Sequence, residues 1–83
     1  MITIYSAPRC GACQTTKATV RRIAEELQVD YQVIDVTEHP EIASRLGIRT
    51  VPVTTVGDGD QVHELMMGDV NPCQLRAAIM SGS

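Results

Sequence analysis

The chain opens with a short run of β-branched and aromatic side chains and then changes to a helical period. Residues 2–5 are typical of a short buried strand. Residues 11–28 predict an amphipathic helix. Its apolar face consists of Thr16, Val20, Ile23, Ala24 and Leu27. Its opposite side carries two pairs at ion-pair spacing, Arg21–Glu25 and Arg22–Glu26.

The middle of the chain predicts a second strand and a short helix. Residues 31–36 form the strand. Thr37 is the expected N-cap of the helix, and Pro40 suits its first turn. Gly47 is a favourable residue for its end. The apolar face of this helix comprises Ile42, Ala43 and Leu46.

The last third predicts a hairpin and a final helix. Residues 53–56 and 61–66 form two strands around a turn at residues 57–60, where glycine and aspartate tolerate positive φ. Gly68 ends the fourth strand. The helix is expected to begin with Asn71 as its cap and Pro72 in its first turn. Its inward-facing residues are Leu75, Ala78 and Ile79.

These elements follow the order βαβαββα over one domain that comprises residues 1–83. The first βαβ unit is expected to be parallel, and the hairpin is antiparallel. The economical α/β architecture is a mixed four-stranded sheet with helices on both faces.

Composition excludes several classes of protein. A net charge of −3 and only two aromatic residues argue against a nucleic-acid-binding protein. No apolar run approaches the ~20 residues of a membrane span. The N-terminus lacks a basic leader and an apolar core, so we expect no signal peptide and a cytoplasmic location. There, three cysteines favour redox chemistry or metal binding over a structural disulfide framework.

The chemistry-bearing motif is Cys10-Gly11-Ala12-Cys13, where the first loop meets the first helix. Free backbone N–H groups and the helix dipole stabilise a thiolate at such a position. Cys13 follows after two residues and is expected to be deeper and less exposed. We therefore assign Cys10 as the nucleophile and Cys13 as the resolving thiol. Arg9 precedes Cys10 and is expected to favour its thiolate further.

The main alternative for the motif is half of a zinc site. Structural zinc needs four ligands, commonly in two spaced pairs. The remaining candidate ligands are isolated: His39, His63 and Cys73. We therefore expect no metal site. For Cys73 the sequence favours a half-buried apolar role over a regulatory or dimerising thiol.

Thr50-Val51-Pro52 precedes the third strand. A cis Val51–Pro52 bond in a tight turn would leave the Val51 backbone free to pair with an extended substrate. A trans bond is far commoner for proline, and the local sequence alone does not overturn that preference.

Residues 4–13 resemble the active-site opening of glutaredoxins and small thioredoxins. Residues 39–52 resemble the thioredoxin stretch that leads into its cis-proline, and Gly68 with Gln74-Leu75 resembles the glycine and last helix of thioredoxins. The resemblance covers essentially the whole chain. It implies a minimal thioredoxin-like fold.

The resemblance also implies an activity and a site. It implies a dithiol–disulfide oxidoreductase that reduces protein disulfides and needs no cofactor. Cys10 would attack the substrate disulfide, and Cys13 would resolve the mixed disulfide. The cis form of Pro52 would lie beside the cysteines, and the substrate would also contact Arg9, Val51 and Gly68.

The chain departs from both families in ways that bear on the electron donor. Thioredoxins place a buried acid behind the cysteine pair, whereas residues 2–5 contain no carboxylate. Glutaredoxins often carry a lysine where this chain has Ala7, and a Gly-Gly pair where it has only Gly68. Without the acid, proton transfer from Cys13 must use water or another group. The missing lysine and second glycine favour a flavoprotein thioredoxin reductase over glutathione as the donor.

Similar small redoxins deliver electrons to ribonucleotide reductase, and a monomer is expected. Three alternatives stay open: a glutathione-dependent glutaredoxin, a redoxin that binds a metal or an iron–sulfur cluster, and a redox sensor or interaction module that only changes shape.

Overall fold

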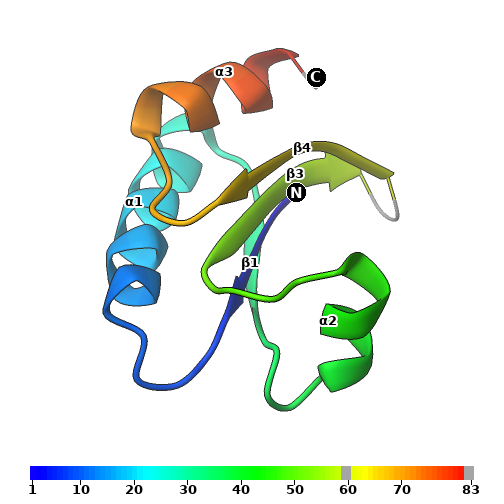
Figure 1. Cartoon of the computed structure of the whole chain (residues 1–83). Coiled ribbons are helices and arrows are strands. Elements are labelled where there is room, and N and C mark those ends of the chain that lie inside the picture. The colour runs from blue at the N-terminus through cyan, green and yellow to red at the C-terminus, as the bar shows by residue number, and fades with distance from the viewer. Residues whose placement is uncertain (59–60, 82–83) are drawn as a thin grey trace.

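The computed structural model describes residues 1–58 and 61–81. The element order is βαβαββα, as the sequence predicts. Figure 1 shows the arrangement of the elements. Their bounds are β1 Ile2–Ser6, α1 Gly11–Leu27, β2 Tyr31–Asp35, α2 Pro40–Leu46, β3 Val53–Asp58, β4 Gln61–Met67 and α3 Pro72–Ser81.

The four strands form one mixed sheet in the order β2-β1-β3-β4. β1 pairs with β2 in parallel, and it pairs with β3 in antiparallel fashion, with Ile4 opposite Thr54. β3 and β4 form the antiparallel hairpin. Helices α1 and α3 cover one face, and α2 lies on the other (Figure 1). The predicted fold class is therefore confirmed.

The core lies between the sheet and the layer of α1 and α3. It is aliphatic, and every residue of β1 is buried because this strand has neighbours on both sides. The core cluster contains Ile2, Ile4, Val20, Ile23, Ala24, Val56, Met66, Val70, Leu75 and Ala78. Removing this apolar surface from water is the main favourable term in folding. This packing also fixes α1 against β1. The cysteine motif begins in the loop between these two elements.

The predicted faces of α1 and α3 are confirmed. The buried residues of α1 are Cys13, Thr16, Val20, Ile23 and Ala24. In α3, Leu75 and Ala78 are buried, and Ile79 packs against the core cluster. The Asn71 carboxamide oxygen accepts hydrogen bonds from the N–H groups of Cys73 and Gln74, at 2.9 and 3.2 Å, so the predicted cap is present.

One of the two predicted ion pairs on α1 is present. Arg21 Nε and Glu25 Oε1 lie 3.3 Å apart. Glu26 instead pairs with Arg76 of α3, with 2.8 Å between Oε2 and Nε. The prediction of an Arg22–Glu26 pair was therefore wrong, because α3 brings a competing guanidinium to the end of α1.

The N-cap of α2 also differs from the prediction. The helix is preceded by His39, not by Thr37, and the His39 side chain makes no capping hydrogen bond. Thr37 is turned back toward the end of β2. Its hydroxyl and its backbone N–H both donate to Asp35 Oδ1, at 2.6 and 2.8 Å. These bonds hold the pKa of the Asp35 carboxyl below its ordinary value of 3.8, and the bond from the Thr37 hydroxyl has the largest effect.

Two further expectations about local structure need correction. Gly57 and Asp58 belong to β3 and not to the hairpin turn, while residues 59–60 lie outside the described part of the chain. In α2, whose C-cap is Gly47 as expected, Leu46 is exposed and no residue is buried. Among the described residues, no helix is both long and apolar enough to cross a membrane.

The end of α1 gives a prediction for stability. Gln28 has φ 55° and ψ 47°, the left-handed conformation that glycine adopts without steric cost. Its N–H and that of Val29 both bond to Ala24 O, so this geometry is required. We expect Gln28→Gly to raise the free energy of unfolding by about 0.5–1 kcal/mol in urea titrations. Gln28→Ala is the control, and an equal gain there would contradict the explanation.

The Asp35 carboxylate gives a prediction for pH dependence. A pKa that is lower in the folded state stabilises the fold above the unfolded-state pKa, and this contribution is lost as the pH falls through the folded-state pKa. We expect Asp35→Asn to unfold at lower urea than the wild type at neutral pH. The difference should vanish under strongly acidic conditions. A constant difference at every pH would show that charge is not the cause.

Candidate active site

The connection from β1 to α1 places Cys10 at the start of a helix. Cys10 is the N-cap of α1, with extended backbone dihedral angles. Its Sγ accepts a hydrogen bond from the Cys13 backbone N–H at 3.1 Å. A cysteine sulfur thus occupies the place that a serine or aspartate oxygen usually takes at a helix N-terminus. The free backbone N–H groups of the first helical turn and the helix dipole stabilise negative charge on this sulfur.

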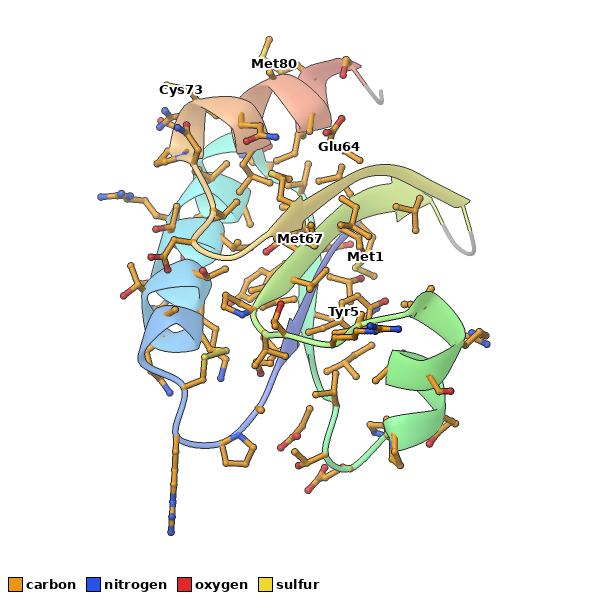
Figure 2. All side chains as sticks on the ribbon, viewed as in Figure 1. Met1, Tyr5, Glu64, Met67, Cys73 and Met80 are labelled. Carbon is orange, nitrogen blue, oxygen red and sulfur yellow. A yellow bond between two sulfur atoms is a disulfide. The ribbon has the colours of Figure 1, made fainter. Side chains whose placement is uncertain are left out.

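Cys10 and Cys13 form a disulfide with their Cα atoms 5.1 Å apart. Figure 2 shows this disulfide as a yellow bond at the start of α1. Cys13 is fully buried on the inner face of α1, whereas Cys10 is partly exposed. The expected difference in depth is therefore confirmed. The sulfur of Cys10 can therefore reach a substrate disulfide in solvent, whereas the buried sulfur of Cys13 can reach only Cys10.

Arg9 is exposed and lies in the turn that leads into Cys10. Its φ is +61°, a conformation that residues other than glycine rarely adopt. The turn thereby directs the chain from the end of β1 into the helix. The role of Arg9 as a substrate contact stays a prediction.

The other predicted substrate residues lie at the same end of the sheet as the cysteines. Val53 is opposite both Tyr5 and Met67, so Pro52 and Gly68 lie level with the end of β1 from which the Cys10 loop departs. The Gly68 N–H donates to Pro52 O at 2.9 Å, and Gly68 has φ +77°.

The peptide bond between Val51 and Pro52 is cis, as the resemblance implies. Pro52 is buried and Val51 is half-buried. Within residues 1–58 and 61–81, the Val51 N–H and C=O form no hydrogen bond. The backbone of Val51 is thus free for pairing, although its contact with a substrate stays a prediction.

The charged groups around the site are few. Lys17 lies one turn beyond Cys13 and contributes to the low pKa of Asp35, after the hydrogen bonds of Thr37 and Glu38 to that carboxylate. No group of three or more histidine, cysteine or acidic side chains lies close enough to hold a metal ion, as far as the described residues go.

Cys73 differs from its expected environment. It is an exposed free cysteine on α3, well away from the disulfide (Figure 2). The expectation of a half-buried apolar role was therefore wrong. Cys73 lies in the first turn of α3, where its backbone N–H donates to the Asn71 carboxamide oxygen and its side chain is exposed.

Sequence reasoning did not assign a chemical role to two hydroxyl groups that are buried between α1 and the sheet. Thr16 lies one turn after Cys13 on α1, and Thr54 lies opposite Ile4 in the sheet. Both side chains are fully buried. The signal was present in the sequence, because each threonine interrupts an otherwise apolar stripe.

Comparisons with known proteins agree with this geometry. The family model described as Glutaredoxin matches residues 2–62. The chain is 33% identical over 68 residues to Thioredoxin 1 of Nostoc sp., an alignment that covers 80% of this chain and 64% of the Nostoc protein. It is 36% identical over 78 residues to Thioredoxin Asp f 29 of Aspergillus fumigatus, covering 89% and 69%. The chain thus spans just under two thirds of the cyanobacterial relative.

A solved structure gives the same result for the fold. A mutant thioredoxin from Halobacterium salinarum superimposes with a TM-score of 0.87 at 28% identity, and the match covers 98% of this chain and 72% of that one. A family model that matches well over half of the chain establishes membership. This chain belongs to the glutaredoxin family within the thioredoxin/glutaredoxin superfamily, as a small redoxin with a Cys-X-X-Cys pair.

Proposed function

We propose that this protein is a dithiol–disulfide oxidoreductase that reduces protein disulfides through Cys10 and Cys13. The observation that carries the proposal is the arrangement of the two sulfur atoms. Cys10 is partly exposed at the helix N-terminus and accepts the Cys13 N–H at 3.1 Å, while Cys13 is buried behind it. This asymmetry suits a nucleophile and an internal resolving thiol.

The first step is attack on the substrate. The Cys10 thiolate attacks one sulfur of the substrate disulfide, and a mixed disulfide forms while the substrate S–S bond breaks. The leaving sulfur departs with the electron pair and takes up a proton. The helix N-terminus favours this step because it increases the thiolate fraction of Cys10.

The second step releases the product. Cys13 attacks Cys10 Sγ and forms the Cys10–Cys13 disulfide, and the bond between Cys10 and the substrate breaks. The two cysteines are thereby oxidised by two electrons, and the substrate is reduced by two. Their proximity, with Cα atoms 5.1 Å apart, makes this attack intramolecular and fast.

The substrate is expected to bind at the sheet end that carries Arg9, Val51, Pro52 and Gly68. The free Val51 backbone offers an N–H and a C=O, so an extended segment can pair there as an added strand. A disulfide in such a segment would lie next to Cys10.

The electron donor that we favour is a flavoprotein thioredoxin reductase. A 54-residue stretch of the NADPH-dependent thioredoxin reductase 3 of Arabidopsis thaliana is 33% identical to this chain. Ala7 and the single Gly68 replace the glutaredoxin lysine and glycine pair, which weakens the case for glutathione. Ribonucleotide reductase is a candidate acceptor. The protein would work in the cytoplasm, where the reducing environment keeps cysteines in the dithiol form. It would act there as a monomer.

The activity predicts a clear result in insulin-disulfide reduction. With dithiothreitol as donor, we expect turnover by the wild type and complete loss in Cys10→Ser, which lacks the nucleophile. Cys13→Ser should accumulate a mixed disulfide through Cys10, visible by mass spectrometry. Cys73→Ser is the matched control and should keep wild-type activity. Unchanged turnover in Cys10→Ser would overturn the proposal.

The same assay separates the donors when dithiothreitol is replaced. NADPH with a thioredoxin reductase is expected to sustain turnover, and glutathione with glutathione reductase is expected to sustain much less. The reverse result would assign the protein as a glutathione-dependent glutaredoxin.

The helix N-terminus predicts early ionisation of the Cys10 thiol. We expect the rate of its alkylation by iodoacetamide in the reduced protein to rise with a midpoint at about pH 7 or below, against about 8.5 for a free cysteine. Peptide mass spectrometry assigns the site, and urea-unfolded protein is the control. Equal midpoints in folded and unfolded protein would contradict the proposed role of the helix.

A further inference from the structure

Two threonine hydroxyl groups are buried without a hydrogen-bond partner in the described part of the chain. They belong to Thr16 and Thr54, and both side chains are fully buried. In a helix, a threonine hydroxyl commonly donates to the carbonyl one turn earlier, as Thr15 does to Gly11 O at 3.5 Å. Thr16 does not. Leaving a buried hydroxyl unpaired carries a desolvation cost, so each case requires an explanation.

Both hydroxyl groups belong to the buried layer between α1 and the sheet, which also contains Cys13. Thr16 follows Cys13 by three residues on the buried face of α1, a spacing that puts neighbouring Cβ atoms about 5–6 Å apart. Thr54 is directly opposite Ile4, whose side chain belongs to the core under α1. Residues that are opposite in an antiparallel pair share a face, so Thr54 also faces the α1 layer.

Cys13 needs a hydrogen-bond donor at one point of the proposed reaction. It must become a thiolate to attack Cys10, and its buried position disfavours that charge. The Cys13 backbone N–H cannot stabilise it, because it donates to Cys10 Sγ. β1 contains no acidic or basic residue.

The charged and titratable groups on the elements around α1 lie elsewhere. Lys17 interacts with Asp35 at the end of β2, and Arg76 of α3 pairs with Glu26. Arg9, Arg49 and Asp69 in the adjoining loops are exposed, and so is Cys73 on α3. Hydroxyl groups are therefore the polar groups that the described core offers in the layer of Cys13.

We propose that the hydroxyl groups of Thr16 and Thr54 donate hydrogen bonds to the Cys13 thiolate during resolution of the mixed disulfide, so that both stabilise the reacting sulfur directly. The inference rests on the proposed function. In the disulfide state the Cys13 sulfur is tied to Cys10 and carries no charge. Once that bond is broken, the sulfur can move between staggered χ1 positions toward the two donors.

Atoms and electrons balance in this step. The Cys13 thiol loses its proton, and the thiolate, stabilised by the hydroxyl groups, attacks Cys10 Sγ. The bond between Cys10 and the substrate breaks with its electron pair on the substrate sulfur, which takes up a proton. The net proton transfer is from Cys13 to the substrate thiol, and neither threonine changes its protonation.

The test measures the resolution step separately from the first attack. Reduced protein in a Cys73→Ser background, which removes the exposed third thiol, reacts with a limiting amount of 5,5′-dithiobis(2-nitrobenzoate). The first coloured thiolate reports attack by Cys10, and the second reports resolution by Cys13. Thr16→Val and Thr54→Val keep the side-chain shape and remove the hydroxyl. Thr55→Val is the matched control, because Thr55 is buried on the opposite face, where it lines a groove with α2.

We expect Thr16→Val and Thr54→Val to slow the second release about tenfold at neutral pH, the effect of losing one hydrogen bond to a charged group. The pH midpoint of the second release should rise by about one unit. The first release should be unchanged, as should both releases in Thr55→Val. Thr16→Ser and Thr54→Ser, which retain the hydroxyl, should restore the wild-type pH midpoint.

Two negative outcomes are distinct. If both valine variants resolve with the wild-type pH profile, the proposed role of the hydroxyl groups is wrong, even where the variants change thermal stability. If the wild type itself releases no second thiolate, the dithiol mechanism fails.

Discussion

The hydrogen bond from the Cys13 backbone N–H to Cys10 Sγ ties the chemistry of this protein to its fold. It exists because α1 begins at Gly11, with Cys10 as its N-cap. The position of α1 depends in turn on its apolar face, which packs on Ile2 and Ile4 of the buried central strand. A shift of α1 by one residue would remove the sulfur from the helix N-terminus and expose Cys13. Core packing in this fold thus sets which sulfur is the nucleophile.

Most of the fold follows from periodicity in the sequence. The apolar stripe of α1 and the short apolar run of β1 suffice to place these two elements. The helix has a single apolar face, and the strand is buried along its whole length. The cap of α3 was equally predictable because Asn71-Pro72 combines two independent start signals. Where the local rule and the tertiary contacts agree, the sequence alone is enough.

The errors arise where a second partner, close by in the chain or distant from it, competes for a side chain. Thr37 has the chemistry of an N-cap, but the Asp35 carboxylate takes both its hydroxyl and its N–H. Glu26 has the spacing for Arg22, but α3 brings Arg76 to it. The site shows the same limit. CxxC identifies Cys10 and Cys13, whereas the position of Thr54 in the buried layer depends on the β1–β3 register, which no local pattern gives.

The two cysteines face different electrostatic problems, and this difference explains why the core is not wholly apolar. Cys10 lies at the protein surface, where a helix N-terminus supplies donors to its thiolate without cost to the core. Cys13 must be shielded from external disulfides, and the burial that shields it also opposes its ionisation. An entirely aliphatic layer would protect Cys13 and leave it a poor nucleophile. Two hydroxyl groups at Thr16 and Thr54 satisfy both requirements, because they add donors without adding a charge that would itself need a partner.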